Sequence, residues 1–341
     1  MTAACIFGCA GLTLSVEEDA FFRDVKPWGF ILFKRNVESP DQVRALVGAL
    51  RATVGRPDAP VLIDQEGGRV QRLGPPHWPR YPTGRAYAEI AANDPLTGRA
   101  VARLGARLIA HDLAALGITV DCAPVLDVPV KGADAIIGDR AYGATIESIA
   151  TLGRAFAEGL IAGGVLPVIK HIPGHGRATA DSHLALPVVD ETRAELEADF
   201  APFRILSDMP MAMTAHVVYS AIDPKRPATT SPEMIELIRG DLGYGGLIMS
   251  DDLSMKALKG DFKSRAKRSL KAGCDVVLHC NGDMEEMQAV ASGTKSLSGH
   301  AKRRAEAVLA RLPRTPEPLD LAEARARFAA AFPELAPGLA S

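Results

Sequence analysis

The sequence predicts an α/β fold: a single-domain (β/α)8 barrel of the TIM type with a C-terminal helical extension. Eight short apolar runs rich in Val, Ile and Leu alternate with amphipathic helical patterns, and no Gly-x-Gly-x-x-Gly motif follows the first run. Near-continuous apolar runs are typical of strands buried on both faces of a parallel sheet. Their alternation with helices over about 280 residues favours a barrel, and the missing glycine motif disfavours a dinucleotide-binding half.

The candidate strands lie in order at residues 3–9, 29–33, 60–64, 118–123, 165–170, 210–216, 246–250 and 274–280. No linker between them is long enough to require a second domain, so we expect one domain over residues 1–341. The Pro- and Ala-rich stretch 313–341 is expected to be a peripheral helical tail. Its helix, near residues 321–332, is expected to pack on the outside of the barrel.

The helices expected between the strands have recognisable ends. Ser39 and Pro40 supply an N-cap and a proline at the first helical position, and Gln42 is expected to complete a capping box. A second apolar stripe over 149–160 ends at a Gly-Gly pair, and Ser231-Pro232 opens a third helix. Arg103 and Arg107, on another helix, are expected to lie on a solvated face.

Composition excludes several classes of function. The chain has 39 Lys and Arg against 41 Asp and Glu, a net charge of −2, and no basic stripe, so nucleic-acid binding is not expected. The 5 cysteines are odd in number and form no Cys-x-x-Cys pair. They are therefore interpreted as small core residues in a reducing compartment.

No targeting or membrane segment is predicted. The N-terminal stretch carries no Lys or Arg and runs into Glu17, Glu18 and Asp19, which is unlike a signal peptide. The apolar segments are too short to span a bilayer. We expect a cytoplasmic protein without membrane contacts.

Polar residues follow several of the predicted strands. In a (β/α)8 barrel the active site lies at the C-terminal ends of the strands. The residues at or just beyond those ends are acidic, basic and His side chains, which a single mouth would bring together: Asp64, Arg140, Lys170, His171, His216, Asp251 and Asp252.

Four motifs carry a family resemblance. They are Asp-Gln-Glu-Gly-Gly-Arg at 64–69, Ala-Pro-Val-Leu-Asp at 123–127, Lys-His-Ile-Pro-Gly-His-Gly at 170–176 with Asp-Ser-His at 181–183, and Ser-Asp-Asp-Leu at 250–253. In this order they resemble glycoside hydrolase family 3, and within it the bacterial β-N-acetylhexosaminidases. One departure is Ile172, where the family usually has Phe.

The residues suit retaining hydrolysis of a β-glycoside, which needs a carboxylate on one face of the anomeric carbon and a proton donor near the leaving oxygen. Asp251, at the end of a buried strand, is expected to be the nucleophile. The best match for the donor is His183, because imidazole titrates near physiological pH. Asp181 would fix its tautomer and stabilise its charge. The glycines around His175 suggest that this loop swings inward when sugar binds.

The resemblance also implies a binding site and a role. It implies that the glycone subsite is lined by Asp64, Arg72, Arg140, Lys170, His171 and Asp251. It implies a small carbohydrate substrate, with removal of GlcNAc from an anhydro-N-acetylmuramyl partner, with or without peptide, in peptidoglycan recycling. No metal or organic cofactor is implied, and we expect a monomer.

Plainer roles are expected for several neighbouring residues. Asp252, next to the expected nucleophile, is expected to cap the following helix, since strand alternation points one of two neighbours inward. His175 is expected to hold its loop by hydrogen bonds, and Asp127 to anchor a loop. Glu66 is expected to form a buried ion pair with an Arg. His216 fits a satisfied core histidine or a pocket wall equally well.

Other functions fit the same residues. A different glycone, such as glucose or xylose, is the first alternative, and transfer of GlcNAc to phosphate is the second. A metal-dependent barrel hydrolase would use side chains that lie close in sequence plus the strand-end carboxylate as ligands: His171, His175, His183 and Asp251. A non-catalytic sugar-binding barrel is the last alternative.

Overall fold

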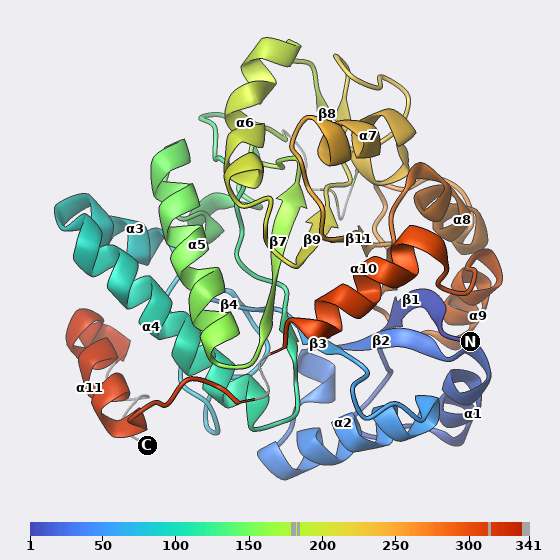
Figure 1. Cartoon of the computed structure of the whole chain (residues 1–341), viewed down its shortest axis with the longest axis horizontal. Coiled ribbons are helices and arrows are strands. Elements are labelled where there is room, and N and C mark those ends of the chain that lie inside the picture. Colours follow the sequence, from blue (N-terminus) through green and yellow to red (C-terminus); the bar gives the residue numbers. More distant parts are fainter. Residues whose placement is uncertain (179–181, 183–184, 313–314, 336–341) are drawn as a thin grey trace.

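A computed structural model describes residues 1–178, 182, 185–312 and 315–335. Eight parallel strands close into a barrel in the order β1-β12-β11-β9-β7-β6-β3-β2 (Figure 1). This architecture confirms the predicted fold class, and each predicted run overlaps one barrel strand. The barrel strands are β1 (Ala3–Phe7), β2 (Pro27–Leu32), β3 (Val61–Ile63), β6 (Val120–Asp121), β7 (Leu166–Ile172), β9 (Met211–Thr214), β11 (Leu247–Asp252) and β12 (Val276–His279).

Two strands run further at their C-terminal ends than the sequence predicted. β7 continues to Ile172, which pairs with Thr214 of β9, and β11 continues to Asp252, which pairs with Leu278 of β12. Both ladders pass through a register irregularity before these last pairs. Polar residues at 170, 171 and 251 therefore belong to the barrel strands themselves. A strand backbone orients a side chain more rigidly than a loop does.

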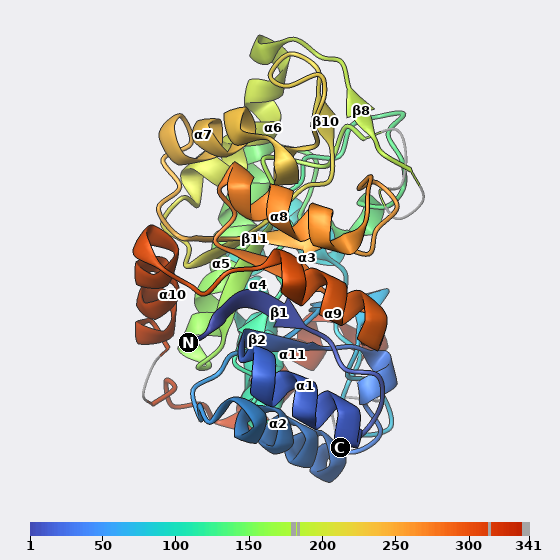
Figure 2. The same ribbon diagram turned by 90° about the vertical axis from the view of Figure 1, so that its right-hand side faces the viewer.

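Helices surround the barrel (Figures 1 and 2). They are α1 (Val16–Val25), α2 (Pro40–Val54), α3 (Gly84–Asn93), α4 (Pro95–Ala114), α5 (Ile146–Ala162), α6 (Arg193–Ile205), α7 (Pro232–Gly240), α8 (Phe262–Ala272), α9 (Met284–Gly293), α10 (Gly299–Ala310) and α11 (Leu321–Ala331). Short 3-10 turns are η1 (Lys34–Asn36), η2 (Gly138–Arg140), η3 (Ala228–Thr230) and η4 (Pro333–Leu335). Two small sheets pair β4 (Gln65–Gly67) with β5 (Val70–Gln71) and β8 (Val188–Val189) with β10 (Val218–Tyr219).

The predicted caps are present, with one difference. Ser39 accepts the backbone N–H of Gln42, and Ser231 accepts that of Met234. The Gln42 side chain does not close the expected capping box. It accepts from the Glu38 N–H and donates to the carbonyl oxygens of Leu12 and Asn36, because the preceding turn brings these groups within its reach.

The barrel interior is a packed core closed at one end by α10. Side chains from the beginnings of the strands, such as Trp28, Val120 and Leu247, cluster with Ala305 and Val308 of α10. The helix therefore seals the N-terminal end of the barrel. All five cysteines are buried and free, as the core interpretation predicted: Cys5, Cys9, Cys122, Cys274 and Cys280.

Helix α11 packs outside the barrel against α4 (Figure 1), in the place expected for the terminal helix. Phe328 is fully buried, and its ring lies 6.1 Å from that of Tyr81 and 5.1 Å from that of Phe332. The solvated position expected for Arg107 is wrong. The chain leading to α11 covers it, and its guanidinium donates to the Glu317 carbonyl at 2.6 Å.

We expect Phe328→Ala to destabilise the protein by about 3–5 kcal/mol, because it empties a fully buried aromatic site. The side chain does not line the cavity described below, so the effect should be confined to stability. Urea unfolding measures the loss. Leu96→Ala, at a position 80% exposed, is the control and should change stability by less than about 0.5 kcal/mol. Equal effects of the two substitutions would show that α11 does not dock.

Candidate active site

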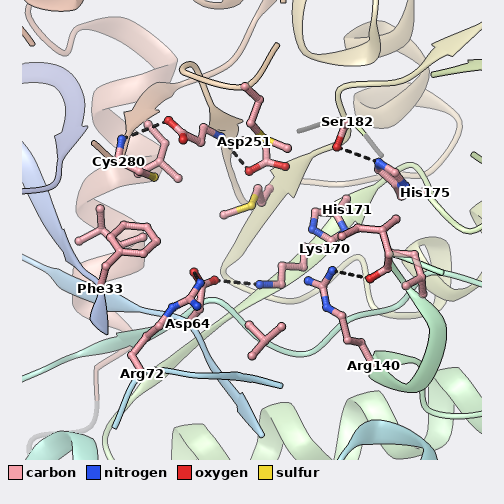
Figure 3. A pocket seen from close by; sticks show the side chains of 18 of the residues that line it. Phe33, Asp64, Arg72, Arg140, Lys170, His171, His175, Ser182, Asp251 and Cys280 are labelled. Atoms are coloured by element: carbon pink, nitrogen blue, oxygen red, sulfur yellow. Dashed lines mark hydrogen bonds and ion pairs between the residues drawn. The ribbon is translucent and has the colours of Figure 1, made fainter. Parts of the chain in front are cut away.

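A cavity of about 330 Å³ opens at the C-terminal ends of the barrel strands. Six of the predicted site residues line it: Asp64, Arg72, Arg140, Lys170, His171 and Asp251. Figure 3 shows their side chains converging from several strands on one space. The other two, Asp181 and His183, lie outside the described residues. Ser182, between them in sequence, is described, lines the cavity and is 2% exposed.

A buried ion-pair network forms one side of the cavity. The Lys170 ammonium lies 3.0 Å from Asp64 and 2.7 Å from Glu66. Arg140 binds both oxygens of Glu66, at 2.7 and 2.9 Å, which confirms the ion pair expected for that glutamate. Arg72 binds the second oxygen of Asp64 at 2.9 Å.

The network keeps its carboxyl groups ionised. Burial opposes ionisation of Asp64, but Lys170 and Arg72 outweigh it and lower the pKa of that carboxyl well below its usual range. Burial likewise opposes ionisation of Glu66, yet Arg140 and Lys170 lower its pKa to about 2. The cavity wall therefore carries charged side chains of both signs in fixed positions. Its ammonium and guanidinium groups can donate hydrogen bonds to the hydroxyl groups of a ligand, and its carboxylates can accept hydrogen bonds from them.

A tight hairpin brings Arg72 back to Asp64. Strands β4 and β5 pair antiparallel immediately after Asp64, and Gly67, which ends β4, and Gly68, which follows it, have φ of 97° and 57°. Residues other than glycine rarely adopt two consecutive positive φ angles. The Gly-Gly pair in the sequence thus makes it possible for side chains eight positions apart to meet.

Asp251 lies near the end of β11, across the cavity from the Asp64–Arg72 pair in Figure 3. Among the described residues, its carboxylate accepts one hydrogen bond, from the backbone N–H of Asp252 at 2.7 Å. Burial opposes its ionisation, but His216 and His171 lower its pKa below the ordinary value. The group is an ionised carboxylate with bonding capacity left for a ligand.

The role expected for Asp252 is wrong. It caps no helix, since α8 begins ten residues later with Asp261 as its N-cap. Its carboxylate instead accepts the backbone N–H groups of Ser254 and Cys280, at 3.0 and 3.1 Å, and the Ser254 hydroxyl. Asp252 also lines the cavity, because the register irregularity in β11 breaks simple alternation. Its oxygens are occupied, whereas those of Asp251 are largely available.

Asp127 anchors the loop after β7, as expected. It is fully buried and accepts the backbone N–H groups of His171 and His175, at 3.1 and 2.6 Å. Its other oxygen lies 2.7 Å from Nδ1 of His171, which fixes that ring and leaves Nε2 for the cavity. His175 contacts the Ser182 hydroxyl through Nε2 at 3.2 Å, and the Ala257 N–H donates to the Ser182 carbonyl.

His216 is a satisfied core histidine rather than a cavity wall. It is fully buried, its Nδ1 lies 2.7 Å from the Thr229 hydroxyl, and its Nε2 lies 2.9 Å from the Asp252 carbonyl oxygen. Since a carbonyl only accepts, Nε2 carries the proton. Trp78 is buried in the outer core and does not line this cavity.

Sequence reasoning missed the apolar part of the cavity. Phe33, Met213, Met255 and Cys280 line it, together with the rim residue Arg69. The Arg72 guanidinium lies over the Phe33 ring, with its carbon 5.2 Å from the ring centroid. Phe33 and Cys280 each end a predicted strand, so the strand-end rule could have found them. They were overlooked because an apolar residue next to a strand also fits a core position.

The described residues hold no group of three or more His, Cys, Asp or Glu side chains arranged to bind a metal ion. Two of the four ligands suggested for a metal site, His171 and His175, contact Asp127 and Ser182 respectively, and a third, His183, is not described. Within the same described ranges, no helix combines the length and apolar character needed to cross a membrane.

Comparison with known proteins gives consistent results. Residues 14–314 match the glycosyl hydrolase family 3 N-terminal domain. A protein of Alkalilimnicola ehrlichii named Beta-hexosaminidase is 43% identical over 282 residues, 81% of this chain and 80% of its own length. A Pseudomonas aeruginosa protein of the same name is 38% identical over 285 residues, 82% of this chain and 83% of its own. The crystal structure of native NagZ from Neisseria gonorrhoeae has a TM-score of 0.85 at 34% identity, covering 100% of this chain and 98% of that one.

We expect acid to weaken the fold through His175. Burial, with His171 beside it, lowers the pKa of His175 from 6.5 to about 4. Between those values the unfolded chain binds a proton that the folded chain does not. The contribution of the neutral His175 to the free energy of unfolding is therefore complete above pH 6.5 and is lost as pH falls toward 4. We expect the free energy of unfolding of His175→Gln, measured with urea, to depend less steeply on pH than that of the unmodified protein. The difference in slope should reach up to about 1.4 kcal/mol per pH unit.

The control for this experiment is His77→Gln, at an exposed position. It should leave the slope unchanged over the same pH range. If the two variants show the same slope as the unmodified protein, His175 does not titrate as its burial requires.

Proposed function

The chain belongs to glycosyl hydrolase family 3, and from that premise we propose that it is a retaining exo-β-N-acetylglucosaminidase that removes terminal β-linked GlcNAc. That it is a glycoside hydrolase follows from the family and from the relatives named Beta-hexosaminidase. The observation that carries the proposal is Asp251, an ionised and largely unoccupied carboxylate that faces a network of hydroxyl-binding groups across a sugar-sized cavity.

In the proposed mechanism, the Asp251 carboxylate attacks the anomeric carbon and forms a covalent glycosyl-enzyme while the glycosidic oxygen takes a proton. Water then attacks the same carbon from the opposite face and releases Asp251 with net retention. The position of Asp251 within β11 supports this role, since a nucleophile must be held within a fraction of an ångström.

His183, oriented by Asp181, is proposed to give the proton in the first step and to take one from water in the second. An imidazole can do both near neutral pH. Two observations on neighbouring residues support the assignment. Ser182, between the two in sequence, lines the cavity, and Asp127 anchors the loop at the backbone of His171 and His175.

Asp64, Arg72, Arg140, Lys170 and His171 are proposed to bind the glycone. Asp64 can accept from sugar hydroxyls, while Arg72, Lys170 and the free Nε2 of His171 can donate to others. Arg140 contributes through Glu66, whose two oxygens it binds. The buried charges lie in fixed positions before substrate arrives, so they need little rearrangement on binding.

The substrate and setting belong to the same proposal and rest on the family resemblance. We propose GlcNAc-anhydro-N-acetylmuramyl compounds, with or without peptide, as substrates, in cytoplasmic peptidoglycan recycling by a monomer. We also propose that residues 1–341 form one domain. The contact of Glu317 with Arg103 and Arg107 of α4, which ties the C-terminal stretch to the barrel, supports that last point.

Trapping tests the nucleophile. Incubation with a 5-fluoro-GlcNAc slow substrate should label one peptide, and mass spectrometry should place the label on Asp251, because that carboxylate forms the covalent bond. Asp251→Ala should remain unlabelled and lose roughly a thousandfold or more in kcat while it stays folded. Asp252→Ala, the matched change at the next carboxylate, should still be labelled. Label on Asp252 would refute the assignment.

The same preparation tests the glycone and the acceptor. Chromogenic GlcNAc, glucose and xylose substrates should give a clear preference for GlcNAc, and a preference for the glucoside or xyloside would overturn the hexosaminidase proposal. Product analysis in phosphate buffer should yield free GlcNAc. Accumulation of GlcNAc 1-phosphate would instead identify a phosphorylase.

A further inference from the structure

Gln65 lies between two members of the ion-pair network, Asp64 and Glu66, yet its own side chain does not line the cavity. It is 1% exposed and belongs to β4, the first strand of the hairpin that follows the barrel strand β3. A fully buried amide has to find hydrogen-bond partners inside the protein. The partners of Gln65 show what it does.

The Gln65 side chain holds the returning end of the hairpin. Its Oε1 accepts the backbone N–H groups of Arg72 and Leu73, at 2.9 and 3.0 Å. Its Nε2 donates to the Leu73 carbonyl oxygen at 3.0 Å. Three hydrogen bonds from one side chain therefore fix the backbone of the residue that binds Asp64.

Gln65 is itself fixed to the barrel wall. Its backbone N–H donates to Oδ1 of Asp121 at 2.9 Å, and Asp121 lies on the neighbouring strand β6. Burial raises the pKa of the Asp121 carboxyl to about 8. An unbroken series of hydrogen bonds thus leads from β6 through Gln65 to the Arg72 backbone.

Arg72 needs such support because its side chain is long and partly exposed. Its guanidinium must meet Asp64 at 2.9 Å and lie over the Phe33 ring at 5.2 Å. A displaced backbone at residue 72 would misplace both contacts. We propose that Gln65 is a positioning residue that holds Arg72 against Asp64 and thereby sets the affinity of the enzyme for the glycone.

This inference rests on the proposed function. If it is correct, Gln65→Met, which keeps the side-chain length and removes all three hydrogen bonds, should raise KM for an aryl β-GlcNAc substrate roughly tenfold. The kcat should stay within about threefold, because binding that is equal in the ground and transition states affects KM alone. Gln65→Asn, which keeps the amide but is too short to reach both N–H groups, should give the same split if the Met variant folds poorly.

The matched control is Gln42→Met on α2. Gln42 also makes three side-chain hydrogen bonds, but to the backbone of Leu12, Asn36 and Glu38. This variant should lower Tm without changing KM. If Gln65 contributed only to packing, its substitution would also lower Tm and leave KM unchanged.

A double-mutant cycle tests whether Gln65 acts through Arg72. Arg72→Met should itself raise KM at least as much as Gln65→Met. In the Arg72→Met background, the change at Gln65 should add no more than about threefold, since the group that it positions is gone.

The outcomes separate this inference from the proposed function. If the unmodified protein does not cleave the GlcNAc substrate, the proposed function fails. If it does, and Arg72→Met raises KM while both Gln65 variants behave like Gln42→Met, the positioning role is wrong. Full multiplicative effects in the double variant, or a fall in kcat with KM unchanged, would also overturn it.

Discussion

The site depends on one buried ammonium group. Lys170 is 2% exposed and lies between the carboxylates of Asp64 and Glu66, so each charge is stable in the barrel only because its partners are present. Arg72 and Arg140 complete the charge balance from the hairpin and from η2. Three segments that are distant in sequence, the hairpin after β3, η2 and β7, are thereby tied to one point, and the polar side of the cavity exists before any ligand arrives.

The supports of the two proposed reacting groups differ in kind. Asp251 is carried by a barrel strand, whereas Ser182, the described residue that precedes His183 in sequence, is held by hydrogen bonds with His175 and Ala257. This division suits a reaction in which the nucleophile must keep its position and the proton carrier has to serve first the leaving group and then water.

The sequence predicted the barrel, its strand order along the chain and six cavity residues, because strand ends converge by geometry and charged residues there are conspicuous. It could not predict that β7 and β11 extend beyond a register irregularity, which depends on pairing with neighbouring strands. The role of Asp252 was misjudged for that reason. Phe33 and Met213 were missed because apolar residues at strand ends carry no signal that separates cavity from core. The polar partners of Gln65 are invisible in sequence, since they arise from a turn.

The packed core residues beneath the cavity constrain the order in which reaction products can leave. Ile31, Met213 and Leu278 belong both to the cavity lining and to the interior core that α10 closes from below. Among the described residues, these side chains close the cavity from beneath, so a sugar bound there would leave through the opening by which it entered. In the proposed reaction the rest of the substrate occupies that opening, so the leaving fragment would go first and the freed monosaccharide last. Accumulated monosaccharide would then compete directly with new substrate for the same binding site.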